Sequence, residues 1–122
     1  MKRILVIDDS SAIRKAIRRI LEQLGYTVSE AEDGIKALAL LDLDSTFDAI
    51  LCDIDMPNMD GLSFLGALPA HPGIQAPPII MCTTHTGFDK IQTALSLGAT
   101  EYIMKPFDAE IIGSKLEACG VQ

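Results

Sequence analysis

Positive charge is scarce in this sequence, and long hydrophobic runs are missing from it. Its 122 residues include 10 lysines and arginines against 17 aspartates and glutamates, which gives a formal net charge of −7. Because nucleic-acid binding depends on a basic face that neutralises phosphates, this balance argues against direct nucleic-acid binding. No apolar run approaches the roughly 18 residues of a membrane span, and the N-terminal run Ile4–Ile7 is too short for a signal peptide. We therefore expect a cytoplasmic protein with no membrane insertion.

Cysteine and histidine are also sparse, and neither forms a metal-binding pattern. The three cysteines include no Cys-x-x-Cys pair; Cys52 and Cys82 lie inside apolar runs, and Cys119 lies near the C-terminus. Buried, reduced thiols fit this pattern better than a disulfide or a metal site. The two histidines, His71 and His85, are isolated, so the sequence has no zinc-ligand spacing.

What the sequence does contain is a regular alternation of short apolar runs and helix-like segments. The runs predict five strands at Arg3–Ile7, Thr27–Ala31, Ala49–Cys52, Pro78–Thr83 and Glu101–Met104. The segments with helical periodicity predict five helices at Ser11–Leu24, Gly34–Leu43, Leu62–Leu68, Phe88–Leu97 and Ala109–Cys119. Such alternation implies right-handed crossovers with helices on both faces of one sheet. We predict a single α/β domain over residues 1–122, built on a doubly wound parallel sheet.

Charged residues follow three of the predicted strands. Asp8 and Asp9 come after the first strand, Asp53 after the third and Lys105 after the fifth. Because the carboxyl ends of parallel strands share one edge of the sheet, these side chains are expected to meet in one pocket. Clustered carboxylates either raise a pKa or bind a cation. Hard oxygen ligands without sulfur or imidazole favour Mg²⁺, or Mn²⁺ in its place.

The same pocket has the groups needed to carry a phosphoryl group. A carboxylate attacks phosphorus to give an aspartyl phosphate, and the Lys105 ammonium would pair with a phosphoryl oxygen. A hydroxyl is needed beside that group, and Thr83 or Thr84 at the end of the fourth strand fits. Taken singly, the Asp8-Asp9 pair or Asp53 is weak evidence for a functional site, since such residues often only start a loop or cap a helix. Their occurrence together at several strand ends is hard to explain by structural roles alone.

Four sequence blocks together resemble the receiver domain of two-component response regulators. The match extends over the whole chain, and the blocks fall in the family's order and spacing: Asp8-Asp9-Ser10, Asp53–Gly61, Pro78–Thr84 and Lys105-Pro106-Phe107. The resemblance implies a flavodoxin-like sheet with strand order 2-1-3-4-5. It also implies a phosphoacceptor switch and not an enzyme, since a receiver catalyses only its own phosphorylation and slow dephosphorylation.

The resemblance assigns roles around the acidic pocket. Asp53 would accept the phosphoryl group from the phosphohistidine of a sensor histidine kinase or a phosphotransfer domain. Asp9 would bind Mg²⁺ directly and Asp8 largely through water, while Asp53 and the backbone carbonyl of Asp55 would complete the protein ligands. The expected cofactor is therefore Mg²⁺, for which Mn²⁺ can substitute.

The resemblance also assigns the residues that convert phosphorylation into a signal. Lys105 would pair with the phosphoryl group, Thr83 would move its hydroxyl towards that group, and Tyr102 would be the aromatic switch that follows Thr83. The output protein would bind the face formed by the fourth helix, fifth strand and fifth helix. Pro106 matches a family proline that often follows a cis peptide bond.

Two departures from the family pattern concern the path of the hydrolytic water. Thr84 stands where alanine or glycine is usual, which narrows access for small phosphodonors or water. Asp55 and His85 occupy the variable positions that flank this path. Their combined effect on the lifetime of the aspartyl phosphate stays open.

The first predicted helix carries a basic face with two readings. Its members are Arg14, Lys15, Arg18 and Arg19. Opposite an apolar stripe, such a face is most often simply solvated. The alternative is that it docks the histidine-bearing helix bundle of a kinase.

Other functions fit less well. Asp53-Ile54-Asp55 reads as the DxD motif of haloacid-dehalogenase-type phosphohydrolases, but there the motif follows the first strand and a cap covers the site, for which this chain has no room. No glycine-rich loop follows the first strand, which argues against a nucleotide-binding module. Within the receiver reading, a stand-alone chemotaxis-type regulator is favoured over a receiver excised from a longer transcriptional or enzymatic regulator.

Overall fold

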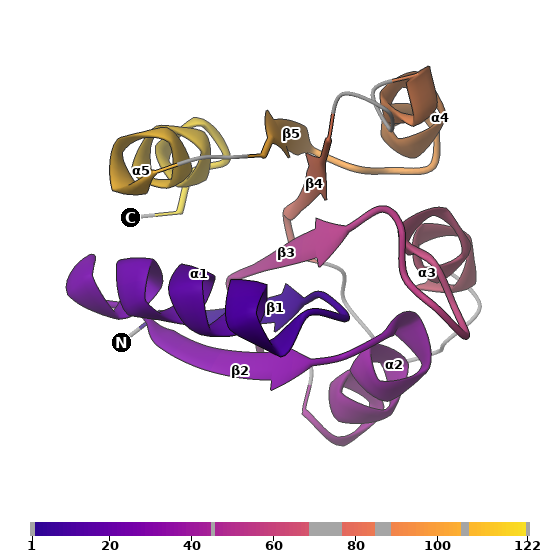
Figure 1. Cartoon of the computed structure of the whole chain (residues 1–122), viewed down its shortest axis with the longest axis horizontal. Coiled ribbons are helices and arrows are strands. Elements are labelled where there is room, and N and C mark those ends of the chain that lie inside the picture. The colour runs from indigo at the N-terminus through magenta and orange to yellow at the C-terminus, as the bar shows by residue number, and fades with distance from the viewer. Residues whose placement is uncertain (1, 45, 69–76, 85–88, 106–107, 122) are drawn as a thin grey trace.

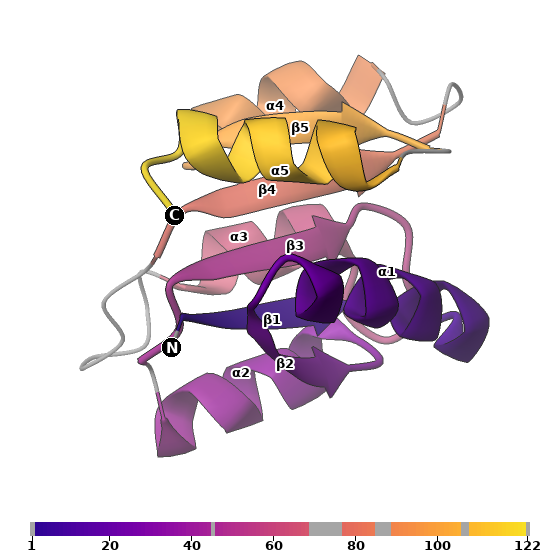
Figure 2. The same cartoon turned by 90° about the vertical axis from the view of Figure 1, so that its left-hand side faces the viewer.

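The fold is an open parallel sheet between two layers of helices (Figures 1 and 2). A computed structural model describes residues 2–44, 46–68, 77–84, 89–105 and 108–121. The elements are β1 (Arg3–Ile7), α1 (Ser11–Gln23), β2 (Thr27–Ala31), α2 (Gly34–Leu43), β3 (Ala49–Asp53), α3 (Gly61–Ala67), β4 (Ile79–Thr83), α4 (Ile91–Ser96), β5 (Glu101–Met104) and α5 (Ala109–Ala118). Among the described residues, no helix has the length and apolar character needed to cross a membrane.

The predicted elements are confirmed, with small shifts at their ends. β3 continues through Asp53, and β4 begins at Ile79 instead of Pro78. The largest difference is at α4, which begins at Ile91 and not at Phe88; residue 88 lies outside the described residues. The side chain of Lys90, at the N-terminal cap, makes no capping hydrogen bond to the helix, and residues 89–90 form a 3₁₀ turn before it. Without a capping side chain, the first α-helical turn loses its usual support.

The sheet order is β2-β1-β3-β4-β5, and every strand pair is parallel, as predicted. In this register Ile7 pairs with Cys52, so the next residues, Asp8 after β1 and Asp53 at the end of β3, lie side by side. Thr83 pairs with Met104, which brings the ends of β4 and β5 together. The register therefore gathers the predicted site residues at one edge.

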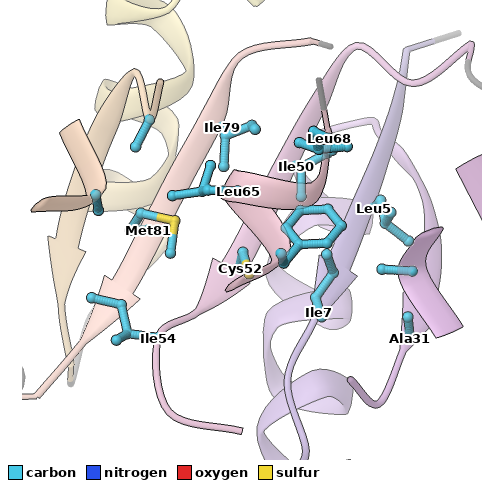
Figure 3. Close-up of a cluster of buried hydrophobic side chains, with 14 of the residues drawn as sticks. Leu5, Ile7, Ala31, Ile50, Cys52, Ile54, Leu65, Leu68, Ile79 and Met81 are labelled. Atoms are coloured by element: carbon cyan, nitrogen blue, oxygen red, sulfur yellow. The ribbon is translucent and has the colours of Figure 1, made fainter. Parts of the chain in front are cut away.

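Side chains of alternate strand residues enter two separate cores. Leu5 and Ile7 face the layer of α2, α3 and α4 (Figure 3). Phe64 of α3 is fully buried in this layer. Ile4 and Val6 face the layer of α1 and α5. Because both faces are covered, the central strands β3 and β4 are buried along their whole length. Cys52 and Cys82 are buried free thiols, as expected, whereas the free thiol Cys119 is only partly buried.

Candidate functional site

Three carboxylates converge at the carboxyl edge of the sheet. Asp8 and Asp9 follow β1, Asp53 ends β3, and one carboxylate oxygen of each lies within 4.8 Å of the others. Asp8 and Asp53 are buried, with 1% and 8% of their surface exposed, and Asp9 is exposed. The predicted convergence is thus present. An all-oxygen donor set with one side open to solvent fits a hard divalent cation that keeps some of its waters, such as Mg²⁺.

Lys105 is the counter-ion of this cluster. Its Nζ lies 3.0 Å from Asp8 Oδ2 and 3.3 Å from Asp53 Oδ1. Its backbone N–H donates to the carbonyl oxygen of Thr83 at 2.7 Å, which ties the end of β5 to β4. Burial alone would lower the pKa of Lys105, but the two carboxylates outweigh burial and raise it. The ammonium therefore stays charged at neutral pH.

Asp53 is electrostatically strained in the cluster. Burial, followed by repulsion from Asp8, raises the pKa of Asp53 to about 6, although Lys105 opposes the shift. Its ordinary value is 3.8. A carboxyl group with this pKa is mostly ionised at neutral pH, and its charge is poorly compensated. A bound cation would therefore stabilise the ionised Asp53 carboxylate.

The loop between β3 and α3 is held by α2. The Asn58 amide donates to Asp33 Oδ2 at 2.9 Å, and the Gly34 N–H donates to the Met59 carbonyl oxygen at 3.2 Å. Asp33 is buried and also caps α2 by accepting from the Lys36 N–H at 2.9 Å. Sequence reasoning missed Asp33 as a support of this loop. The position of Asp33, just before the glycine that starts α2, predicts a helix cap. It does not predict the second hydrogen bond of Asp33, which comes from Asn58.

Asp55 belongs to the same loop, and its side chain points to α4. Its carboxylate pairs with Lys90 Nζ at 2.7 Å, and both side chains are about half exposed. This ion pair links the loop beside Asp53 to the start of α4. Sequence reasoning expected an extra carboxylate beside the pocket but did not predict that Lys90 would balance it.

Thr83 and Tyr102 lie where β4 and β5 end. The Thr83 hydroxyl is buried and donates to the carbonyl oxygen of Thr84 at 3.1 Å. Tyr102 is partly buried against the core beside α4, and Lys115 Nζ of α5 lies 5.4 Å from its ring centroid. Lys115 also pairs with Glu101 at 3.0 Å. The Lys115 ammonium thus lies over the ring of Tyr102, the residue predicted to be the aromatic switch.

Comparison with known families decides what this arrangement is. A family model of the response regulator receiver domain matches residues 4–117. The chain belongs to this family. It is therefore a phosphoacceptor switch of two-component signalling and not a conventional enzyme, and receivers of this family work with histidine kinases and output proteins. The family binds Mg²⁺ at its acidic pocket.

Several relatives resemble this receiver along nearly its whole length. The chemotaxis protein CheY1 of Helicobacter pylori strain J99 is 40% identical over 116 residues, which cover 94% of each chain. A chemotaxis protein CheY homolog of Campylobacter jejuni is 39% identical over 94% of this chain and 89% of its own. The structure of Vibrio cholerae CheY4 is 36% identical, covers 98% of both chains and has a TM-score of 0.87.

One similar structure bears on the acidic cluster. It is the receiver domain of a sensor histidine kinase from Pseudomonas aeruginosa, with a magnesium ion coordinated in its active site cleft. It is 29% identical to this chain, covers 98% of both chains and has a TM-score of 0.86. The three-carboxylate cluster described above has the donor chemistry that such an ion needs.

The basic face of α1 is only partly free in this receiver. Arg14 Nε pairs with Glu30 Oε1 at 3.0 Å, and Arg18 Nη1 pairs with Glu30 Oε2 at 2.6 Å. Lys15 and Arg19 are exposed and form no ion pair with the described residues. Arg14 and Arg18 thus serve the receiver's own fold, while Lys15 and Arg19 keep both readings of this face open.

Some predicted residues lie outside the described part of the chain. They are His85, expected beside the water path, and Pro106 of the Lys105-Pro106-Phe107 block. Thr84, expected to narrow access to the pocket, is described and exposed.

Proposed function

We propose that this receiver accepts a phosphoryl group on Asp53 in a reaction that requires Mg²⁺. The observation that carries the proposal is the position of Asp53, whose carboxylate lies within reach of Asp8, Asp9 and Lys105. Asp8, Asp9 and Asp53 would hold the cation, together with the backbone carbonyl of Asp55, and Mn²⁺ would serve in its place. The bound cation would neutralise the charge that develops on the phosphoryl oxygens.

The residues of the chain account for the rest of the transfer. An oxygen of the ionised Asp53 carboxylate attacks phosphorus, the bond from phosphorus to the imidazole nitrogen of a phosphohistidine breaks, and its electron pair stays on that nitrogen. Lys105, already 3.3 Å from Asp53 Oδ1, pairs with the transferred group. Reversal to aspartate requires water, which Thr84, Asp55 and His85 would control. In this proposal the protein catalyses only its own phosphorylation and slow dephosphorylation.

The signal is proposed to pass through Thr83 and Tyr102. A phosphoryl group on Asp53 offers an acceptor that draws the Thr83 hydroxyl away from the Thr84 carbonyl oxygen, and Tyr102 moves into the space released. The output protein would bind the face of α4, β5 and α5. Leu95 of α4, Leu97 at the end of that helix and Ile111 of α5 are each more than 40% exposed. Population shifts of this kind need only a few kcal/mol of differential stabilisation.

The physiological setting is part of the proposal. We propose a single-domain receiver over residues 1–122, phosphorylated in the cytoplasm by a sensor histidine kinase or a phosphotransfer domain. The match covers 94% of the chemotaxis protein CheY1 of Helicobacter pylori. This similarity to chemotaxis proteins supports a stand-alone regulator. A receiver excised from a multidomain regulator is the second candidate. Free cysteines agree with a reducing compartment.

Mass spectrometry after incubation with Mg²⁺ and a small phosphodonor tests the proposal. We expect the wild-type protein to gain one phosphoryl group and Asp53→Asn to gain none. The same gain in Asp53→Asn, or no gain in the wild type, would contradict the proposal. Hydrolysis of added phosphomonoesters with many turnovers would instead favour the haloacid-dehalogenase-type reading.

A further inference from the structure

Asp8 is held at every polar atom, and one of its partners is the charged side chain of Arg14, which has no role in the chemistry described so far. Its N–H donates to the Ala31 carbonyl oxygen at 3.1 Å, and Oδ1 accepts from the Ser10 N–H at 2.9 Å. Its other carboxylate oxygen accepts from Lys105. The remaining atom, the Asp8 carbonyl oxygen, accepts a hydrogen bond of 2.6 Å from Arg14 Nη1.

The orientation of Asp9 depends on that last hydrogen bond. Asp9 is exposed, and no described residue donates a hydrogen bond to its carboxylate. Its backbone nitrogen belongs to the same rigid peptide plane as the Asp8 carbonyl. Fixing the Asp8 oxygen therefore fixes the direction in which the chain enters Asp9, and with it the origin of the Asp9 side chain.

Arg14 is itself firmly placed. Its side chain is only 16% exposed, and its Nε is bound by Glu30 of the edge strand β2. Glu30 is shared with Arg18, which also donates to the Val28 carbonyl oxygen at 3.2 Å. Although burial would raise the pKa of Glu30, its bonds to Arg18 and Arg14 lower it, so the anchor stays ionised. Hydrogen bonds between charged groups that are mostly removed from water are stronger than exposed pairs.

We infer that Arg14 is a positioning residue of the cation site, which holds the Asp8–Asp9 peptide so that the Asp9 carboxylate faces Asp8 and Asp53. Arg14 does not touch the cation in this account; it acts through the Asp8 carbonyl oxygen. The inference rests on the proposed use of the three carboxylates as Mg²⁺ ligands. Groups that orient metal ligands in this way change metal affinity by about 10- to 100-fold when they are removed.

The test compares Mg²⁺ affinity in two matched variants, measured by calorimetric titration of the unphosphorylated protein. Arg14→Met keeps the apolar stem and loses both the bond to Asp8 and the pair with Glu30. Arg18→Met also removes one cation from Glu30 and from α1, but leaves the bond from Arg14 to Asp8 in place. We expect the dissociation constant for Mg²⁺ to rise about 10-fold or more in Arg14→Met and to stay within about twofold of wild type in Arg18→Met.

Urea unfolding of the cation-free proteins separates positioning from general stability. We expect the two variants to lose comparable free energies of unfolding, since each gives up a bond to Glu30 and one to a backbone carbonyl. Equal losses of Mg²⁺ affinity in the two variants, or wild-type affinity in Arg14→Met, would overturn the inference.

A third variant keeps the inference testable where Arg14→Met does not fold. Arg14→Lys retains one point charge in place of the planar fork that spans Asp8 and Glu30, so its affinity for Mg²⁺ should lie between those of wild type and Arg14→Met. Wild-type affinity in folded Arg14→Lys would then overturn the inference. A wild-type protein that binds Mg²⁺ but gains no phosphoryl group refutes the proposed function alone, whereas one that does not bind Mg²⁺ refutes both.

Discussion

Lys105 Nζ lies 3.3 Å from Asp53 Oδ1, although the two residues are 52 positions apart in the chain. The same ammonium lies 3.0 Å from Asp8 Oδ2. One cation thus partly balances a cluster of three carboxylates. It already lies beside the carboxylate that would receive phosphorus, so it can pair with the transferred group without a large movement.

Replacing this cation separates catalysis from cation binding. In Lys105→Met we expect phosphorylation by a small phosphodonor to slow by about 100-fold, since one preorganised charge at the transition state is lost. The affinity for Mg²⁺ should not fall, because a positive charge has been removed from beside the cation site. Phosphorylation rates at saturating Mg²⁺ and calorimetric titrations measure the two effects. A parallel fall of rate and affinity would show that Lys105 acts only by shaping the site.

The raised pKa of Asp53 predicts a dependence of stability on pH. Between 3.8 and about 6 the folded protein retains a proton on Asp53 that the unfolded chain releases. The free energy of unfolding should therefore fall as pH rises through this range, by no more than about 1–2 kcal/mol after allowance for solvent screening. Urea unfolding without divalent cations, at about pH 4 and about pH 7, measures the change in wild type and in Asp53→Asn.

The comparison of wild type with Asp53→Asn isolates the contribution of Asp53 from those of the other titrating groups. Asp33 and Glu30 have lowered pKa values in the folded state, so they act in the opposite direction and lose stability as pH falls. Both groups remain in Asp53→Asn, and only the difference between the two proteins reports on Asp53. If the free energy of unfolding depended on pH identically in the two proteins, the pKa of Asp53 would not be raised in the folded state.

The sequence predicted the acidic cluster because its position depends on a single general property. Asp8 and Asp53 each end an apolar run, and parallel strands bring such ends together whatever the surrounding side chains are. The hydrogen bonds that Arg14 and Asp33 make near the site were not predicted, for the opposite reason. Their partners, the Asp8 carbonyl oxygen and the Asn58 amide, are set by the direction of side chains in the packed fold, which composition and periodicity do not encode.

The buried hydroxyl of Thr83 predicts a protein that is phosphorylated but does not signal. Thr83→Ala removes the donor that would turn to the phosphoryl group but none of the charged groups at Asp53. We expect a phosphorylation rate within about threefold of wild type, because the loss of one neutral hydrogen bond has a modest effect. Phosphorylation should no longer shift the amide resonances of α4 and β5. Thr84→Ala, at the adjacent exposed position, is the control and should retain those shifts. Normal shifts in Thr83→Ala would contradict the switch.

The ion pair between Lys90 and Asp55 predicts an effect on small anionic phosphodonors. In Lys90→Ala the Asp55 carboxylate beside the pocket is left unbalanced, and we expect such donors to react about two- to fivefold more slowly, as befits an exposed pair. Asp55→Asn in the same protein should restore most of the rate. The effect should also shrink at high salt, where exposed charges are screened. If the reaction stayed slow in the protein that carries both Lys90→Ala and Asp55→Asn, Lys90 would act by some means other than balancing Asp55.

Gly61 predicts the sharpest contrast between two glycines of one helix. A Cβ on Gly61 would lie 2.5 Å from the Asp53 carbonyl oxygen and 2.9 Å from Ile54 Cα, whereas nothing lies within 4 Å of a Cβ on Gly66. Gly61→Ala should lower the free energy of unfolding by about 1–3 kcal/mol and slow phosphorylation, because the backbone at Asp53 must shift. Gly66→Ala should raise it by up to about 1 kcal/mol, since alanine favours the helix, and leave phosphorylation unchanged. Urea unfolding measures both, and a stable, fully active Gly61→Ala would show that the backbone of β3 can move without harm to the site.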